Sequence, residues 1–178
     1  MRKARLATLL AAALAAGCAA RPVPDGLPEA AAPLDPASLA GDWQVLGATA
    51  RLAPGDAAAC RVAFAFRGER GLLETRRCRG AAADAAEGSD ETLLWSVDGG
   101  AHRRWRTRGV WPFVHERRFV YASTDYRYLL LGGDAPGDAA ILAREAEVPE
   151  WIYAGLVARL AASGCDVTAL RRLAGTGR

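Results

Sequence analysis

Eight short runs of β-forming residues, separated by turn residues, occupy the chain from residue 42 to residue 144. The separators include residues 54–56, 98–100 and 132–137, which are rich in glycine, proline and aspartate. This number of runs at this spacing is typical of a β-sandwich or an up-and-down β-barrel. The pattern therefore predicts an all-β fold with strands near residues 43–52, 61–66, 71–77, 92–97, 102–108, 117–123, 126–131 and 139–144.

The run 61–66 alternates in a way that predicts one buried face. Val62, Phe64 and Phe66 share one side of the strand, and Arg61 lies on the other. By contrast, residues 80–91 are low in complexity and polar, so we expect a long loop there.

The pattern changes after Pro149, where Ile152, Leu156 and Leu160 recur at intervals of four. A proline in the first turn and Gly164 just past the last apolar residue are typical helix boundaries. The sequence predicts one amphipathic helix from about residue 149 to residue 163, packed by its apolar stripe on the outside of the sheet.

Residues 1–18 have a basic start, an apolar run too short to span a bilayer and small residues before Cys18. This is a secretory signal, and its end resembles the lipobox of bacterial lipoproteins. The resemblance implies a removed signal peptide at 1–17, a lipid anchor on Cys18, a Pro/Ala-rich tether over 18–38 and a folded domain over 39–178. By the same resemblance, Ala19 after the cysteine implies sorting to the outer membrane. The alternative is a plain signal peptide, in which Cys18 carries no lipid.

The charge of the chain is concentrated in the signal segment. The full sequence has 23 Lys+Arg, 20 Asp+Glu and a formal charge of +3, and Arg2, Lys3 and Arg5 provide the whole excess. The remaining 161 residues carry 20 arginines against 20 acids. This balance argues against a nucleic-acid partner and gives no reason to expect a basic membrane-binding patch on the folded part.

Three cysteines remain beyond Cys18, so at most one intramolecular disulfide is expected. A hairpin centred near Glu69 would place Cys60 opposite Cys78, within disulfide reach. Pairing of either residue with Cys165 stays open on spacing alone. A zinc site is not expected, because no CxxC pair exists and the two histidines stand apart in sequence.

Three spaced motifs resemble the conserved regions of the lipocalin family: Gly41-Asp42-Trp43, Thr124-Asp125-Tyr126 and Ile141-Leu142-Ala143-Arg144. The resemblance covers about residues 36–173 and is closest to the branch with bacterial outer-membrane lipocalin and apolipoprotein D. It implies an eight-stranded antiparallel up-and-down barrel with one C-terminal helix packed outside. Lipocalins are the standard example of a barrel of this size that holds one small ligand.

The same resemblance implies structural roles for the motif residues Gly41, Trp43, Thr124–Tyr126 and Arg144. Trp43 closes the floor of the barrel, and Arg144 lays its guanidinium over the indole while donating to backbone carbonyls. Such a cation–π contact contributes about 0.5 to 2 kcal/mol. Thr124, Asp125 and Tyr126 form a tight turn beside the closed end.

Ligand contacts are expected from residues whose parity points them into the barrel. The alternative for the aromatic members of this set is that they contact no ligand and simply fill the barrel interior or pack under the helix. Glu74 and Arg76 either pair with each other, or face solvent near the mouth, or leave Arg76 to receive an anionic lipid headgroup. The predicted set is Phe64, Phe66, Glu74, Arg76, Trp95, Trp105 and Tyr121.

These features predict an outer-membrane lipocalin that binds a small hydrophobic or amphipathic ligand, such as a fatty acid or lysophospholipid, for storage, transport or envelope maintenance. No catalytic residue, cofactor or metal is predicted, and the oligomeric state is left open. One alternative is a lipocalin-like isomerase or synthase that uses Cys78 with Arg76, or Glu74 as a general acid. Another is an envelope interaction protein that uses the arginine-rich stretch 103–118, for which a solvated strand face is the simpler account.

Overall fold

The computed structural model describes residues 32–174, except for 69, 83–84, 109–113 and 136. Cys18 and the predicted signal peptide lie outside the described residues. The elements follow one another as α1 (Pro36–Leu39), β1 (Gly41–Ala48), β2 (Ala57–Arg67), β3 (Gly71–Gly80), β4 (Glu87–Ser96), β5 (Arg104–Thr107), β6 (Glu116–Ala122), β7 (Tyr128–Gly132), β8 (Ala139–Ala143), α2 (Glu150–Ala162) and β9 (Arg171–Arg172).

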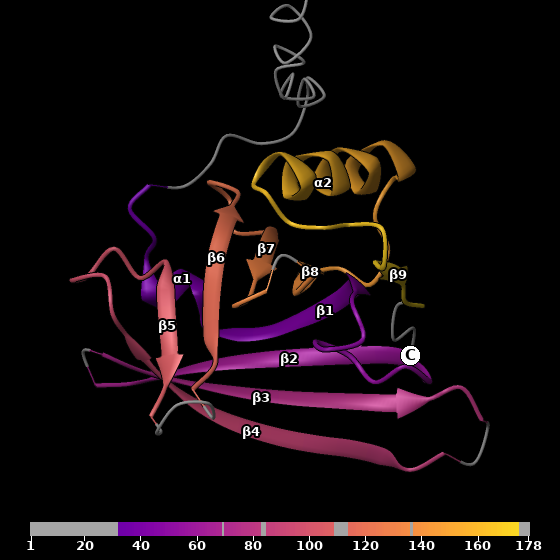
Figure 1. Ribbon diagram of the computed structural model, residues 1–178, viewed down its shortest axis with the longest axis horizontal. Coiled ribbons are helices and arrows are strands. Elements are labelled where there is room, and N and C mark those ends of the chain that lie inside the picture. Colours follow the sequence, from indigo (N-terminus) through magenta and orange to yellow (C-terminus); the bar gives the residue numbers. More distant parts are fainter. Residues whose placement is uncertain (1–31, 69, 83–84, 109–113, 136, 175–178) are drawn as a thin grey trace, which may run out of the picture.

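The strands form one closed antiparallel barrel (Figure 1). Each of β2 to β7 pairs with the next strand in the chain, and β1 pairs with β8 on one side and β2 on the other. The short strand β9 pairs with the last two residues of β1, Gly47 and Ala48. This architecture confirms the predicted eight-stranded up-and-down barrel with a C-terminal helix outside.

The expectation of a loop over residues 80–91 is wrong for half of its length. β3 continues to Gly80 and β4 already begins at Glu87. The polar residues of β4 are held by their pairing with β3, in which Arg77 lies opposite Ser89 and Arg79 opposite Glu87. Backbone pairing with a neighbouring strand here outweighs the weak intrinsic β-propensity of glycine, serine and aspartate.

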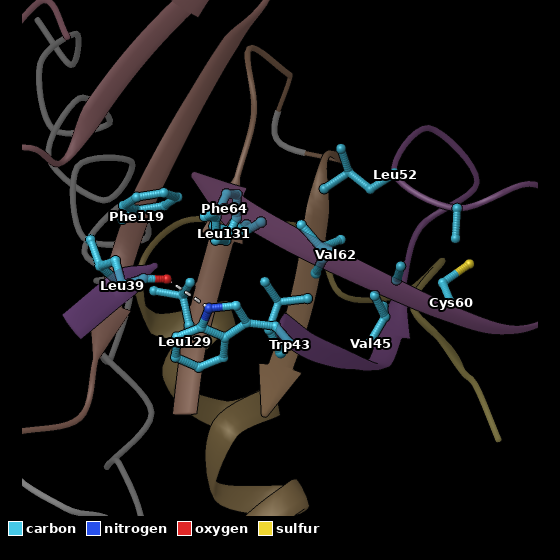
Figure 2. Packing of buried hydrophobic residues seen from close by; sticks show 14 of the residues in the cluster. Leu39, Trp43, Val45, Leu52, Cys60, Val62, Phe64, Phe119, Leu129 and Leu131 are labelled. Carbon is cyan, nitrogen blue, oxygen red and sulfur yellow. Dashed lines mark hydrogen bonds between the residues drawn. The ribbon is translucent and has the colours of Figure 1, made fainter. Parts of the chain in front are cut away.

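One hydrophobic cluster fills much of the barrel interior (Figure 2). Trp43, Phe64 and Phe119 are among its largest fully buried members. The cluster also includes Leu34, which precedes the expected domain start at residue 39, and Leu52 from the loop between β1 and β2. The latter loop therefore folds inward over the open end of the barrel.

A second cluster lies outside the barrel beneath α2, which crosses the side formed by β7 and β8 (Figure 1). Ile152, Leu156 and Leu160 are all buried in this layer, as their spacing predicted. Gly164 follows the helix with a φ of +84°, a conformation that favours glycine. The predicted helix and its packing face are confirmed.

The cysteines follow the predicted register. Cys60 lies opposite Cys78 in the β2–β3 pair, and the two form a disulfide. Cys165 is free and buried in the cluster beneath α2, so it takes no part in this bridge.

The buried stripe of α2 makes a stability prediction. Replacement of Leu156, which is fully buried, by alanine is expected to lower the free energy of unfolding by about 2–5 kcal/mol, because it leaves a cavity between helix and sheet. Trp151→Ala on the exposed face of the same helix is the control and is expected to change it by less than about 0.5 kcal/mol. Urea denaturation followed by circular dichroism measures both, and equal effects would contradict the packing described.

Candidate ligand-binding site

The closed end of the barrel is built around Trp43 and Arg144. The Arg144 guanidinium lies 3.8 Å from the centre of the Trp43 ring. Its nitrogens donate to the backbone carbonyls of Ser38, Ala40 and Asp42 at 2.7–2.9 Å. The Trp43 indole N–H donates to the carbonyl of Leu39 at 2.9 Å. The roles that the resemblance implied for Trp43 and Arg144 are confirmed, and one arginine ties α1, β1 and β8 together.

The turn at Thr124–Tyr126 lies beside this end, as expected. The backbone N–H of Tyr126 donates to the carbonyl of Ser123, and Tyr126 adopts a positive φ of +51°. The hydroxyl of Tyr126 then accepts from the backbone N–H of Asp35 at 2.7 Å. This hydrogen bond joins the turn to the start of α1.

Aromatic side chains fill the interior next to the closed end. Phe64 and Phe119 contact each other with ring centroids 5.5 Å apart, and Phe66 lies 5.7 Å from Trp105. Trp105 also lies 6.3 Å from Phe119 and stacks on His102 at 5.6 Å. The predicted inward orientation of Phe64, Phe66 and Trp105 is confirmed, and these rings pack mainly against one another.

A charged trio lies in the same interior, nearer the open end. Glu74 has a side chain only 2% exposed and forms ion pairs with Arg76 and with Arg117. The Arg117 contact spans 3.4 Å, and both arginine side chains are largely buried, at 15% and 13% exposed. The alternative in which Glu74 pairs with Arg76 is thus the one observed. Two guanidinium groups face one carboxylate, so the trio carries a formal charge of +1.

A pocket of about 270 Å³ opens beside this trio. Arg76 and Cys78 from β3 line it together with Gly88 and Asp90 from β4, and Pro54 of the β1–β2 loop completes it. In the β3–β4 register Arg76 lies opposite Asp90 and Cys78 opposite Gly88, so these four residues share the inner face of the wall. The pocket therefore offers both a cation and an acid beside the disulfide.

A larger pocket of about 310 Å³ lies elsewhere, between α2 and β9. Its lining includes Leu46, Tyr153 and Arg172. Leu46 and Tyr153 belong to the cluster beneath the helix, so this pocket is outside the barrel. The pocket beside Arg76, where charge and apolar wall meet, is the candidate ligand site.

Two predicted ligand contacts, Tyr121 and Trp95, do not face the interior. A β-bulge between Phe119 and Tyr121 reverses the alternation, so Phe119 points inward and Tyr121 packs beneath α2. Trp95 follows the inward-facing Leu94 and lies on the outside, where Arg108 covers its ring at 3.8 Å. The prediction that these two side chains point inward is wrong.

Arg117 and Phe119 are interior residues that were not predicted from the sequence. They are two positions apart on β6, and Arg117 pairs in register with Trp105. Their shared strand parity could have indicated that both face inward, but the neighbouring run of arginines concealed which arginine does so.

Among the described residues no group of three or more His, Cys, Asp or Glu side chains is placed to hold a metal ion. In the part of the chain that the structure covers, neither helix is long and apolar enough to cross a membrane.

No protein-family model and no curated protein sequence matches the chain. Several solved structures do match the chain. Lobster apocrustacyanin A1 is 18% identical, with 79% of each chain covered and a TM-score of 0.58. Apocrustacyanin C2 is also 18% identical over 79% of each chain, with a TM-score of 0.57. The siderocalin Ex-FABP, which functions through dual ligand specificities, is 12% identical over 79% of this chain and 96% of its own, with a TM-score of 0.58.

These likenesses show that the chain has the lipocalin fold. At such identities they concern the fold alone, and they do not distinguish the branch with bacterial outer-membrane lipocalin and apolipoprotein D from the others. That branch remains a prediction from the sequence motifs.

The closed end provides a second stability prediction. Arg144→Lys keeps the charge but removes the planar fork that reaches three carbonyls, so we expect a loss of about 1–3 kcal/mol in the free energy of unfolding. Arg127→Lys is the control, because the exposed pair of Arg127 with Glu145 contributes at most about 1 kcal/mol. Denaturant titrations of the two variants and the wild type test this, and an Arg144→Lys variant as stable as wild type would refute the role of Arg144.

Burial of Tyr121 gives a prediction about alkaline pH. Desolvation raises its pKa from 10.0 to about 12, so the unfolded chain loses this proton first. The unfolded state is therefore favoured as the pH rises from 10 to 12, and stability falls over that range. Lys3 is the only lysine of the chain, so tyrosines are the main side chains that titrate between pH 10 and pH 12.

We expect Tyr121→Phe to reduce the loss of stability between pH 10 and pH 12 by about 2 kcal/mol. Urea titrations at several pH values from 8 to 12 measure the difference. Parallel declines for the wild type and the variant would show that Tyr121 is not buried as described.

Proposed function

We propose that the protein is a lipid-anchored lipocalin of the outer membrane that binds a fatty acid or lysophospholipid for storage, transport or envelope maintenance. The ligand's anionic head lies at Arg76 and its apolar part in the open half of the barrel. The observation that carries this proposal is the charge of the trio: two largely buried arginines share one carboxylate beside a pocket.

A buried guanidinium with unused donors favours an anionic partner. Each arginine has five N–H donors, and one carboxylate has two oxygens to offer. The excess charge of the trio must be balanced by Asp90 across the pocket, by water or by an external anion, because an isolated charge in an apolar surrounding is costly. A carboxylate or phosphate head at Arg76 provides that balance through charge-assisted hydrogen bonds.

The interior limits where an acyl chain fits. The aromatic rings already fill the closed half, so we expect the chain to lie against Val62 and the Cys60–Cys78 disulfide. Leu52 is buried at the open end, and a long acyl chain requires the β1–β2 loop to move outward. Binding therefore favours ligands whose apolar part is short, or a loop that opens.

The anchor and the location rest on the sequence of residues 1–18. Mass spectrometry of the protein extracted from its membrane tests them, since acylation adds fatty-acid mass to a chain that begins at Cys18. The same measurement detects any small molecule that is carried with the protein.

The enzymatic alternative that relied on Cys78 loses its nucleophile. In the structure the Cys78 sulfur is bonded to Cys60, so no thiolate is available beside Arg76. Among the described residues the free cysteine is Cys165, which lies outside the barrel beneath α2, where burial raises the pKa of its thiol.

The binding test uses the chain from Ala19 to Arg178, delipidated, with a fluorescent fatty acid. We expect a saturable isotherm with one site. Arg76→Gln removes a charge-assisted hydrogen bond and is expected to weaken binding by about 10- to 100-fold. Arg77→Gln is the matched control, because Arg77 is the next residue on the same strand but faces outward and is exposed.

Two further variants make the test independent of folding defects. Glu74→Gln frees both guanidinium groups, so affinity for the fatty acid is expected to rise or hold, whereas an uncharged monoacylglycerol is expected to respond to neither Glu74→Gln nor Arg76→Gln. Trp105→Ala removes the interior ring opposite Arg117 of the trio and is expected to weaken the binding of both ligands. Absence of binding by any lipid-like probe at micromolar concentration, in the wild type, would overturn the proposal.

A further inference from the structure

Apolar side chains form a strip on the outside of the barrel wall made by β3 and β4. Leu73 lies opposite Leu93 in the register, and Trp95 and Val97 follow on the same outer face. Leu93 and Val97 are each 43% exposed, although both are large hydrophobic residues. This side of the barrel is turned away from α2, which leaves the strip without a helix to cover it (Figure 1). We call this surface the outer β3–β4 face.

Arginines border the strip on the side of β2 and β3. Arg61 and Arg77 are exposed and lie directly opposite each other in the β2–β3 pair. Neither forms an ion pair with any residue that the structure describes, and the same holds for Arg79. Like charges placed directly opposite each other on a sheet repel. An external anion between them would remove that repulsion.

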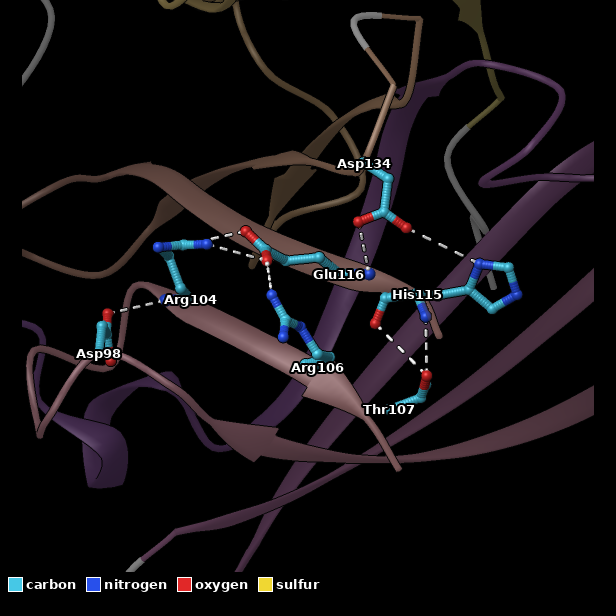
Figure 3. Close-up of polar contacts among 7 residues, drawn as sticks. All are labelled: Asp98, Arg104, Arg106, Thr107, His115, Glu116 and Asp134. Carbon is cyan, nitrogen blue, oxygen red and sulfur yellow. Dashed lines mark hydrogen bonds and ion pairs between the residues drawn. The ribbon is translucent and has the colours of Figure 1, made fainter. Parts of the chain in front are cut away.

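Arginines also border the strip on the side of β5. Arg108 lies over the Trp95 ring, and Arg104 and Arg106 share the single carboxylate of Glu116 (Figure 3). The charge balance gave no reason to expect a basic membrane-binding patch, because the chain without its signal is neutral overall. That expectation concerned the sum of the charges and not their placement.

Acidic side chains are fewer than arginines on this side. Within the described residues, the acids on the outer face of strands β1 to β6 are Asp42, Glu87, Glu91 and Glu116, and Asp98 follows Val97 in the connection to β5. Glu91 accepts from Thr75 at 3.3 Å, and Glu116 is already taken by two arginines. The surface is thus an apolar centre with an excess of positive charge at its margins.

The chain outside the structure indicates what this surface meets. Cys18 precedes the first described residue, Ala32, by 14 residues, and an extended segment of that length reaches at most about 50 Å. If Cys18 carries the predicted lipid, the barrel stays within that distance of a bilayer. Arginines bind anionic headgroups, and tryptophan and aliphatic side chains lie favourably at the interface below them.

We propose that the outer β3–β4 face docks on an anionic lipid bilayer, with Arg61 and Arg77 on the headgroups and Leu93 and Val97 at the acyl boundary. The proposal concerns the orientation of the barrel and goes beyond ligand binding. It places the wall that carries Arg76 on its inner side next to the membrane.

The test again uses the chain from Ala19 to Arg178, which contains every described element but neither the signal segment nor Cys18. Binding to vesicles therefore reports the folded surface and not the anchor. Flotation with vesicles of phosphatidylcholine alone, or with one third phosphatidylglycerol, measures the partition coefficient at 0.1 M and 0.5 M salt. We expect binding to the anionic vesicles at low salt and little binding at high salt or to neutral vesicles.

Variants assign the binding to this face. Arg61→Gln/Arg77→Gln is expected to lower the partition coefficient on the order of 30-fold, and Leu93→Gln to lower it severalfold. Trp151→Gln is the matched control: Trp151 is 59% exposed but lies on α2, across the barrel, and its loss is expected to have no effect.

Fatty-acid binding measured on the same proteins separates this proposal from the proposed function. Arg61→Gln/Arg77→Gln is expected to keep fatty-acid binding, which also shows that it folds, and Arg76→Gln is expected to keep vesicle binding. Failure of the wild-type chain to bind anionic vesicles overturns the proposal. If the wild-type chain is retained on immobilised poly-glutamate in a salt-sensitive way but does not bind vesicles, the proposal is overturned and the face instead fits an acidic polypeptide partner.

Discussion

Closure of the barrel through β1 is the constraint on which the other features depend. β1 pairs with β8 along one edge and with β2 along the other, and this leaves no open edge among the eight barrel strands. Arg144 secures the joint, because its guanidinium covers Trp43 and holds the carbonyls that lead from α1 into β1. Once the sheet is closed, each strand residue lies either inside or outside, and its role is decided by that choice.

The two sides of the wall use arginine differently. Inside, Arg76 and Arg117 are held by the buried Glu74, which limits the cost of placing charge in the barrel. Outside, Arg61 and Arg77 are exposed and repel each other across the β2–β3 pair. The residues after the signal segment carry equal numbers of positive and negative groups, yet the protein presents a small positive charge at the trio within its barrel and a larger one on one outer wall. Ligand binding and membrane docking are the two consequences that we propose.

Several features were predictable because the signals are local or depend on a short register. The helix over Glu150–Ala162 follows from apolar residues four apart, and the Cys60–Cys78 bridge follows from a tight hairpin. Arg144 over Trp43 was predicted by resemblance and not by periodicity. Tyr121 and Trp95 were misplaced because strand alternation gives two faces without saying which is inner, and because the bulge after Phe119 shifts the alternation by one residue.

The sequence by itself determined the all-β class and favoured Cys60 with Cys78, since both depend on residue types at fixed spacing along one or two neighbouring strands. The barrel and its closed end were implied by the resemblance of three motifs. Only the tertiary structure decided that Glu74 receives Arg117 as well as Arg76, because these residues are 43 positions apart in sequence. It also decided that exposed arginines gather around Leu93 on one wall. Composition counts charges, but their distribution in space is set by how the strands pair and which face of each is turned outward.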